Sequence, residues 1–213
     1  MLIAIDGPAA SGKGTLAKRL AARYQLAHLD TGALYRGIGL LVLRAGEDPT
    51  NPDAALRAVD SLPNLTMGDP DLRTLQTGEA ASKVAAIGPV RERLLAFQRH
   101  FAADPPYGLR GAVLEGRDIG TVICPNAPLK IFITADLAVR ARRRLADLNA
   151  QAIDADFDAV QEDLANRDRR DAGRTDAPLK QADDAVLLDT SELSIDTVVS
   201  RAEGLVDALW RGL

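Results

Sequence analysis

A glycine-rich stretch near the start of the chain has the residue types and spacing of a phosphate-binding loop. Residues 7–15 read G-P-A-A-S-G-K-G-T and fit the pattern G-x-x-x-x-G-K. In this pattern glycines let backbone N–H groups turn towards a phosphate, and the lysine reaches the outer phosphates. The stretch follows an apolar run and precedes an amphipathic helical pattern, as the motif requires. We expect the whole loop to bind ATP phosphates: Gly7, Pro8, Ala9, Ala10, Ser11, Gly12, Lys13, Gly14 and Thr15.

The residue after the lysine departs from the common form of this loop. That position usually holds Ser or Thr, whose hydroxyl binds Mg²⁺, whereas here it is Gly14 and the hydroxyl comes one residue later, at Thr15. We therefore expect no direct protein ligand for the metal. Mg²⁺ would be held by the nucleotide phosphates and water, near Thr15.

Two further groups of polar residues follow predicted strands. Thr31 and Arg36 stand about one helical turn apart at the start of a helical pattern, which suits a phosphate seat. Arg117 and Asp118 come directly after a buried strand, at the strand end where open α/β sheets bind ligands. A capping Thr31 with a solvated Arg36 explains the first group equally well, but packing explains charges at the second position poorly.

An arginine-rich helical pattern lies later in the chain. Arg167, Asp171 and Arg174 are spaced by four and three residues, so they share one face of a helix. An ordinary salt-bridged, solvated helix face is the alternative interpretation. Because a phosphate loop is already present, we favour an anion-binding clamp.

Short β-type runs alternate with helical patterns along the chain. The strands are predicted at residues 2–6, 27–30, 112–115, 130–134 and 185–189. Helices are predicted at residues 15–24, 33–44, 89–101, 137–150, 157–170 and 194–210. Because most of the strand runs are continuously apolar, they indicate strands buried on both faces. The pattern predicts an α/β fold with a three-layer, doubly wound, five-stranded parallel sheet.

Two segments between strands exceed what a simple connection requires. We expect a single domain over residues 1–213, with an acceptor-binding insert at about 31–106 and a mobile lid at about 149–179. Within the insert, residues 65–67 and 72–76 flank a G-D-P-D sequence and predict a β-hairpin.

Composition excludes several classes of protein. The net charge of −4 argues against a protein that grips long nucleic acids, and no apolar run is long enough to span a membrane. The single cysteine, Cys124, excludes an intramolecular disulfide and fits the cytoplasm. We expect a monomer.

Several motifs together resemble the bacterial cytidylate kinase family, one of the P-loop nucleoside monophosphate kinases. They are G-K-G-T, L-D-T-G-A-L-Y-R, E-G-R-D-I-G-T-V, N-R-D-x-R-D-x-x-R and A-V-L-L-D-T-S, in this order. The resemblance implies transfer of the γ-phosphoryl group of ATP to CMP or dCMP with Mg²⁺. The products would be ADP and CDP or dCDP.

The resemblance also implies roles for individual residues on the acceptor side. Thr31 and Arg36 correspond to residues near the CMP phosphate, and Ser82 and Arg91 to residues that face the cytosine. The family carries an inserted lobe beside the CMP site. This chain is shorter than the family form between residues 75 and 80, so the third strand of that lobe is in question.

Further correspondences follow from the second half of the chain. Arg117 and Asp118 match a pair that contacts the phosphate and base sides of CMP. Arg167 and Asp171 match a pair near the ribose 2′-hydroxyl, and Arg174 matches a further nucleotide-facing arginine.

The expected mechanism needs no general base, because the nucleophile is already a phosphate oxygen. Lys13 would hold the donor phosphates, and Arg36 and Arg117 the acceptor. Arg167 and Arg174 would close over the transferring group and exclude water. We assign the catalytic role to Lys13, Arg117, Arg167 and Arg174.

Two alternatives stay open at this point. One is a P-loop kinase for another small acceptor, of the adenylate, shikimate, gluconate or dephospho-CoA kinase type. The other is a non-catalytic module that binds ATP and a partner protein. Aromatic residues make up only 4% of the chain, which does not favour a large partner-binding surface.

Overall fold

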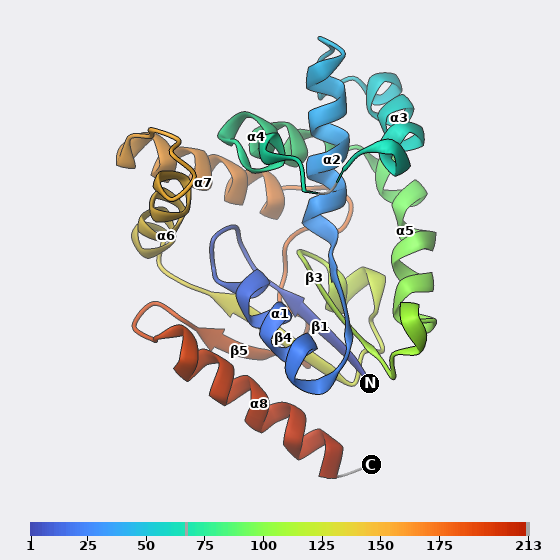
Figure 1. The fold of residues 1–213 in the computed structure, drawn as a ribbon, viewed down its shortest axis with the longest axis vertical. Coiled ribbons are helices and arrows are strands. Elements are labelled where there is room, and N and C mark those ends of the chain that lie inside the picture. Colours follow the sequence, from blue (N-terminus) through green and yellow to red (C-terminus); the bar gives the residue numbers. More distant parts are fainter. Residues whose placement is uncertain (67, 212–213) are drawn as a thin grey trace.

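The computed structural model describes residues 1–66 and 68–211, and its centre is a parallel β-sheet. In these residues the strands are β1 (Leu2–Asp6), β2 (Ala27–Asp30), β3 (Ala112–Gly116), β4 (Leu129–Thr134) and β5 (Val186–Asp189). They are all parallel, in the order β2-β3-β1-β4-β5 (Figure 1). The predicted five-stranded parallel sheet is confirmed, with strand ends that agree within one residue.

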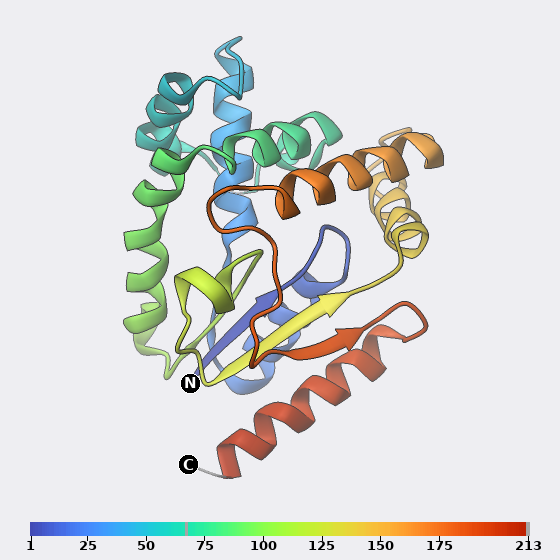
Figure 2. The same cartoon turned by 180° about the vertical axis from the view of Figure 1, so that it is seen from behind.

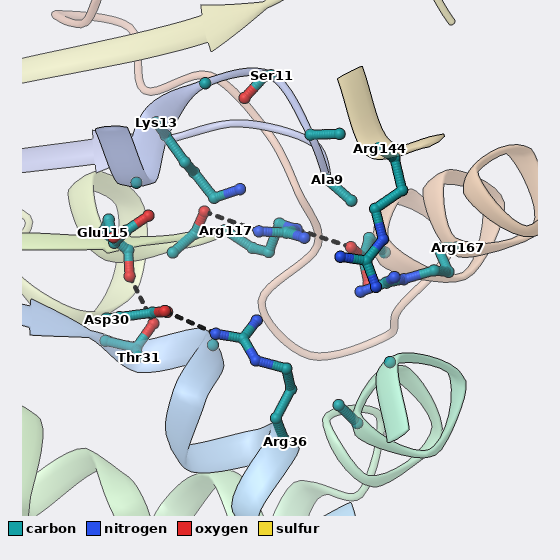
Figure 3. Close-up of a pocket in the computed structure, with 18 of the residues that line it drawn as sticks. Ala9, Ser11, Lys13, Asp30, Thr31, Arg36, Glu115, Arg117, Arg144 and Arg167 are labelled. Carbon is teal, nitrogen blue, oxygen red and sulfur yellow. Dashed lines mark hydrogen bonds and ion pairs between the residues drawn. The ribbon is translucent and has the colours of Figure 1, made fainter. Parts of the chain in front are cut away.

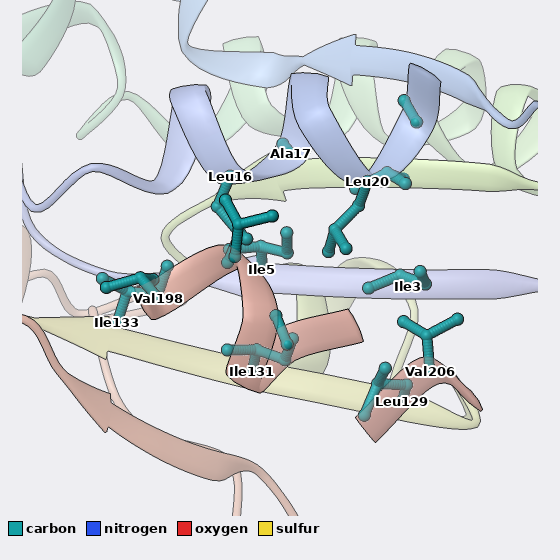
Figure 4. Close-up of a cluster of buried hydrophobic side chains, with 14 of the residues drawn as sticks. Ile3, Ile5, Leu16, Ala17, Leu20, Leu129, Ile131, Ile133, Val198 and Val206 are labelled. Atoms are coloured by element: carbon teal, nitrogen blue, oxygen red, sulfur yellow. The ribbon is translucent and has the colours of Figure 1, made fainter. Parts of the chain in front are cut away.

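Helices cover both faces of the sheet because alternate side chains of a strand point to opposite faces. On one face, Ile3 and Ile5 of β1 pack with α1 (Lys13–Tyr24) and α8 (Ile195–Arg211) (Figure 4). On the other face, Ala4 and Leu114 pack with the π-helical turn η4 (Ile119–Ile123) and with α5 (Gly88–Ala103). This is the predicted three-layer arrangement.

The insert between β2 and β3 is helical and has a core of its own. It contains α2 (Thr31–Arg44), α3 (Pro52–Ser61), α4 (Leu75–Val84), α5 and the short 3₁₀ helices η1 (Leu62–Asn64), η2 (Pro70–Arg73) and η3 (Pro106–Gly108). Ile38, Val84 and Val90 are fully buried in this second core. Figure 1 shows α2, α3 and α4 grouped above the sheet, while α5 runs down beside it.

The predicted hairpin in the insert is wrong. Residues 72–76 lie in η2 and the start of α4, and Met67 of the other predicted strand lies outside the described residues. Asp69 accepts a hydrogen bond from Asp71 N at 3.0 Å, and Pro70 opens a helical turn. Thr74 then caps α4 by accepting from Thr77 N at 3.2 Å. The D-P sequence therefore begins a helix, as capping residues followed by proline do, and no third strand forms at residues 75–80.

The second long excursion forms a pair of helices, α6 (Leu137–Asn149) and α7 (Phe157–Ala172). Asp156 caps α7 by accepting from Asp158 N and Ala159 N, as its position predicts. Leu164 and Val160 of α7 pack on Ala9 of the glycine-rich loop. Seen from behind, α7 runs alongside α4 above the loop that follows β1 (Figure 2). No helix among the described residues is long and apolar enough to cross a membrane.

Candidate active site

A cavity of about 640 Å³ lies at the carboxyl ends of the strands and is lined by several separate parts of the chain. These are the loop after β1, the insert, the turn after β3, the region of α6 and α7, and the residues that follow β5. The predicted site residues that line it are Ala9, Ala10, Ser11, Gly12, Lys13, Gly14, Thr15, Thr31, Arg36, Ser82, Arg91, Arg117, Asp118, Arg167, Asp171 and Arg174. Gly7 and Pro8 do not line it. Folding therefore brings almost the whole predicted set together (Figure 3).

The loop after β1 has the shape of an anion-binding cradle. A Cβ atom on Gly7 would lie 2.1 Å from the Ile133 carbonyl oxygen, so this position requires glycine. Gly12 has a φ of 95°, in the left-handed region. In residues 1–66 and 68–211, the N–H groups of residues 9–12 donate no hydrogen bond. Free N–H groups at a helix N-terminus favour a bound phosphate.

The carbonyl of Ser11 is held by one residue that follows β5 and by one residue of α6. Thr190 Oγ1 donates to it at 3.2 Å, and Arg143 Nη1 lies 3.4 Å from it. Arg143 also donates to the carbonyl oxygen of Thr190 at 2.7 Å. Because a peptide group is planar, fixing this carbonyl also fixes the direction of the Gly12 N–H group.

Lys13 extends along the loop towards the cavity. Its Nζ donates to the Pro8 carbonyl at 3.0 Å. Burial and, to a smaller extent, the nearby Arg117 guanidinium together lower the pKa of Lys13 to about 7. An anion between these two cations would restore the charge of the lysine.

This lowered pKa predicts that nucleotide binding takes up a proton above pH 7. ATP phosphates favour the charged form of Lys13, which is largely neutral in the free protein above its pKa of about 7. Calorimetry of MgATP binding at about pH 8.5, in two buffers of different ionisation enthalpy, should show uptake of about one proton. The uptake should fall towards zero near pH 6, and a Lys13→Arg variant should show none at either pH because arginine stays charged. Equal proton uptake in both proteins would exclude Lys13 as its source.

The predicted phosphate seat at the start of α2 is built differently from a simple cap. Asp30 caps the helix by accepting from Ala33 N at 3.0 Å, and it also pairs with Arg36 at 2.6 Å. The hydroxyl of Thr31 is buried and donates to the Glu115 carbonyl at 2.7 Å. Thr31 is thus not the capping residue, and its oxygen remains able to accept. Figure 3 shows Arg36 directed into the cavity from below Lys13 and Arg117.

The turn after β3 places Asp118 against Arg91 of α5. The two side chains form a buried ion pair. Asp6, at the end of β1, fixes this turn by accepting from Ile119 N at 2.8 Å and Gly120 N at 2.7 Å. Burial raises the pKa of Asp6 to about 6, although these two N–H groups favour its charged form. Residues 91 and 118, far apart in sequence, therefore form one polar unit at the insert side of the cavity.

Helix α7 presents Arg167 and Asp171 of its predicted polar face to the cavity. The prediction that Arg174 shares this helix face is wrong, because α7 ends at Ala172 and Arg174 follows the capping Gly173. Asp171 accepts from Arg117 Nε at 2.8 Å and is also paired with Arg174. Arg170 Nε donates to the hydroxyl of Ser82 at 3.1 Å. Burial lowers the pKa of Arg167 to about 10. Arg117, Asp171 and Arg174 are nearly buried, so this face is not a solvated salt-bridged surface.

Several arginines at or near the cavity have buried N–H groups without a hydrogen-bond partner in the described structure. Among the described residues, buried guanidinium nitrogens without a partner belong to Arg144, Arg167, Arg170 and Arg174. A buried N–H donor without a partner is costly, and anions in the cavity would accept hydrogen bonds from such donors.

Sequence reasoning missed Glu115 as a cavity residue. It is buried, and its Oε1 forms a hydrogen bond of 2.9 Å with His28 Nε2. The protonation of the imidazole and the carboxyl group decides which of the two is the donor. A Cβ on Gly14 would lie 3.2 Å from Glu115 Oε2, so the missing side chain at position 14 leaves room for this carboxylate. The signal was the charge at the end of an apolar strand, at the edge where ligands bind.

Comparison with known proteins agrees with this geometry. The family model described as cytidylate kinase matches residues 3–207. The chain is 53% identical over 212 residues to the cytidylate kinase of Rhodopseudomonas palustris (strain HaA2), covering 100% of this chain and 98% of that one. It is also 53% identical over 202 residues to the cytidylate kinase of Rhodospirillum rubrum, covering 95% of each chain.

The chain belongs to the cytidylate kinase family. Among solved structures, an uncharacterized protein from Eubacterium ventriosum superposes with a TM-score of 0.59 at 17% identity, over 98% of each chain, which shows a shared fold. Membership of the cytidylate kinase family does not favour the other small-acceptor kinases or the non-catalytic module. It confirms the resemblance drawn from the motifs.

Proposed function

We propose that the protein is an ATP-dependent kinase that transfers the γ-phosphoryl group to CMP or dCMP, giving ADP and CDP or dCDP. The observation that carries the proposal is the single cavity that joins a phosphate cradle to the polar insert and to the arginines of α7. Its volume of about 640 Å³ is within the range of small-molecule sites. Family membership over residues 3–207 supports the same activity.

The two substrates occupy opposite ends of this cavity in our proposal. ATP places its phosphates on the N–H groups of residues 9–12 and on Lys13. The CMP base lies between Ser82 and the Arg91–Asp118 pair, whose donors and acceptors suit a cytosine edge.

The remaining residues hold the phosphate and sugar of CMP. Its phosphate meets Arg36, Arg117 and the oxygen of Thr31, all of which line the cavity. The ribose lies beside Arg167 and Asp171. Arg174 completes the positive surround of the transferring group.

Catalysis in this site is positioning together with charge stabilisation. The attacking group is a phosphate oxygen, so no side chain must remove a proton from it. Lys13, Arg117, Arg167 and Arg174 surround the space between donor and acceptor and stabilise the charge on the three equatorial oxygens. The predicted insert, at about 31–106, grips the acceptor. The predicted lid, at about 149–179, closes over both nucleotides and excludes water.

The residues present fit a magnesium ion carried in with the nucleotide. In the described part of the chain, no group of three or more His, Cys, Asp or Glu residues could hold a bare metal ion. The carboxylates of Asp30 and Glu115 do line the cavity near Lys13, and they suit hydrogen bonds from metal-bound water. When bound, Mg²⁺ neutralises charge on the β- and γ-phosphates. We expect Glu115, rather than Thr15, to be the protein group closest to this role.

The setting of the protein is also a proposal. A monomer in the cytoplasm, acting on small nucleotides and not on nucleic acid, accounts for the net charge of −4 and the single buried cysteine, Cys124.

Acceptor preference tests the proposed function. CMP and dCMP should be better acceptors than UMP by at least about 10-fold, and AMP should be poor. A site that hydrogen-bonds one base leaves its polar groups unpaired with another. The assay follows ADP release with ATP and each nucleoside monophosphate in turn. Equal kcat/KM values for AMP and CMP would contradict the proposal and indicate an adenylate kinase activity.

A further inference from the structure

One arginine of α6 connects three elements around the phosphate loop. Arg140 is 6% exposed, and its Nε donates to the carbonyl of Ala135 at the end of β4, at 2.9 Å. Its Nη1 lies 3.3 Å from the carbonyl oxygen of Ala9, in the phosphate loop. The same guanidinium binds Asp168 of α7 through both carboxylate oxygens, at 2.7 and 3.3 Å. A planar guanidinium is suited to such fixed, multiple contacts.

The contact with Ala9 determines how the loop presents an N–H group. The carbonyl of Ala9 and the N–H of Ala10 belong to one planar peptide, so they point in opposite directions. Arg140 holds the carbonyl, and Ala10 lines the cavity. Ala10 has a φ of 59°, a strained value for a residue with a side chain. Such a conformation persists only where its surroundings hold it, and Arg140 is one of the groups that do so.

The contact with Asp168 connects Arg140 to the part of α7 that lines the cavity. Asp168 directly follows Arg167 and precedes Asp171 by three residues, and both of these neighbours line the cavity. Apolar packing of α7 on Ala9 joins the same two elements. The peptide group after Ala9 and the helix that carries Arg167 are therefore held by one partly buried ion pair.

We propose that Arg140 and Asp168 are a positioning pair that holds the phosphate loop and helix α7 in the relative position that catalysis requires. The inference rests on the proposed function, because the loop and α7 serve donor and transition state there. ATP on the loop fixes the peptide between Ala9 and Ala10. Because Arg140 contacts both Ala9 and Asp168, fixing this peptide also restricts the motion of Asp168. Helix α7 is then held with Arg167 and its neighbours over the phosphates.

A purely structural role for the pair makes a different prediction. A pair that only joins α6 to α7 would stabilise the protein, and breaking it would lower Tm and leave the folded enzyme with normal kcat. A positioning pair affects kcat in protein that is fully folded. It also determines whether ATP binding at the loop slows hydrogen exchange in α7.

The test uses Asp168→Asn in the full chain, with Glu162→Gln as control. Both variants remove one negative charge from α7, but Glu162 is exposed and forms no ion pair in the described structure. At saturating ATP and CMP, and below the Tm of each protein, we expect Asp168→Asn to lower kcat at least about 10-fold. Its KM for ATP should change less than about three-fold, because the loop N–H groups remain. Glu162→Gln should match the unaltered protein.

Hydrogen exchange with MgATP alone gives a readout that needs no turnover. In the unaltered protein and in Glu162→Gln, ATP should slow exchange in both the phosphate loop and residues 157–172. In Asp168→Asn, ATP should slow exchange in the loop only. Arg140→Met, which keeps a long side chain but cannot donate to Ala9 or Asp168, should lose the same protection of α7 and supplies the test if Asp168→Asn does not fold.

The outcomes separate this inference from the proposed function. Normal kcat together with normal ATP-dependent protection of α7 in the variants would overturn the positioning pair, and so would a kcat loss that disappears once unfolded protein is accounted for. If the unaltered protein failed to phosphorylate CMP, the proposed function would fall instead. The exchange experiment would still report on the link between loop and helix.

Discussion

Lys13→Ala is expected to lower kcat/KM for phosphoryl transfer to CMP by at least about 100-fold, with the fold intact. Removing one charged group that stabilises the transferring phosphoryl has an effect of this size. In the free protein the Lys13 ammonium contacts only the Pro8 carbonyl and forms no ion pair in the described structure. Its pKa, lowered to about 7 mainly by burial, shows that its charge is disfavoured there. Truncation therefore removes little stability.

The measurement combines kinetics with a thermal melt. Lys83→Ala is the matched control, because the Lys83 side chain of α4 is 35% exposed and forms one ion pair in the described structure, with Glu79. The control should keep its kcat/KM, and both variants should keep a Tm close to that of the unaltered protein. A folded Lys13→Ala protein with nearly full activity would remove the phosphate-loop assignment.

Arg174→Ala is expected to lower kcat/KM for CMP by at least about 100-fold. The Arg174 side chain is 5% exposed, lines the cavity and pairs with Asp171. Asp171 keeps its bond from Arg117 at 2.8 Å when Arg174 is removed, so no carboxylate is left buried without a partner. The loss should therefore appear in the kinetics more than in Tm.

Arg169→Ala is the control for this variant. Arg169 lies near the end of α7, five residues before Arg174, but it is exposed and its side chain bonds only Asn166 in the described structure. Its removal should change kcat/KM by less than about two-fold. Hydrogen exchange should also slow between about residues 149 and 179 when ATP and CMP are both present. The phosphates would lie between the clustered arginines and reduce their mutual repulsion, so the segment would open less often. Unchanged kinetics for Arg174→Ala with equal exchange in the two states would contradict a lid that acts as a clamp.

The sheet and the phosphate loop were predictable because their signals are local. Continuous apolar runs indicated strands buried on both faces, and the loop between residues 7 and 15 stood between a strand and a helix. The helical pattern predicted from residue 157 begins where α7 does. These features depend on short stretches of chain, which sequence patterns describe well.

The insert was harder to predict because tertiary packing decides it. Helix α4 contains Gly78, which weakens a helical pattern, yet the Arg167 side chain lies 3.0 Å from where a Cβ on Gly78 would be. A larger residue there would displace an arginine of the site. The glycine is thus explained by α7, which is nearly 90 residues away in sequence, and no local pattern contains that relation.

The same reason explains the residues of the site that were missed. Glu115 matters because position 14 has no side chain and His28 lies beside it. Arg140 appeared only as one of several arginines in a helical pattern, and its contacts with Ala9 and Asp168 depend on how three elements meet. Motif spacing identified residues that face the cavity, but it could not identify those that support them from behind.

The most direct test of the proposed activity follows the phosphorus atoms themselves. Phosphorus NMR of the unaltered protein with MgATP and CMP should show the resonances of ADP and CDP rising together as those of ATP and CMP fall. Little inorganic phosphate should form, because the closed cavity excludes water from the transferring group. Release of inorganic phosphate without CDP, or no change in the spectrum with folded protein, would contradict phosphoryl transfer to CMP.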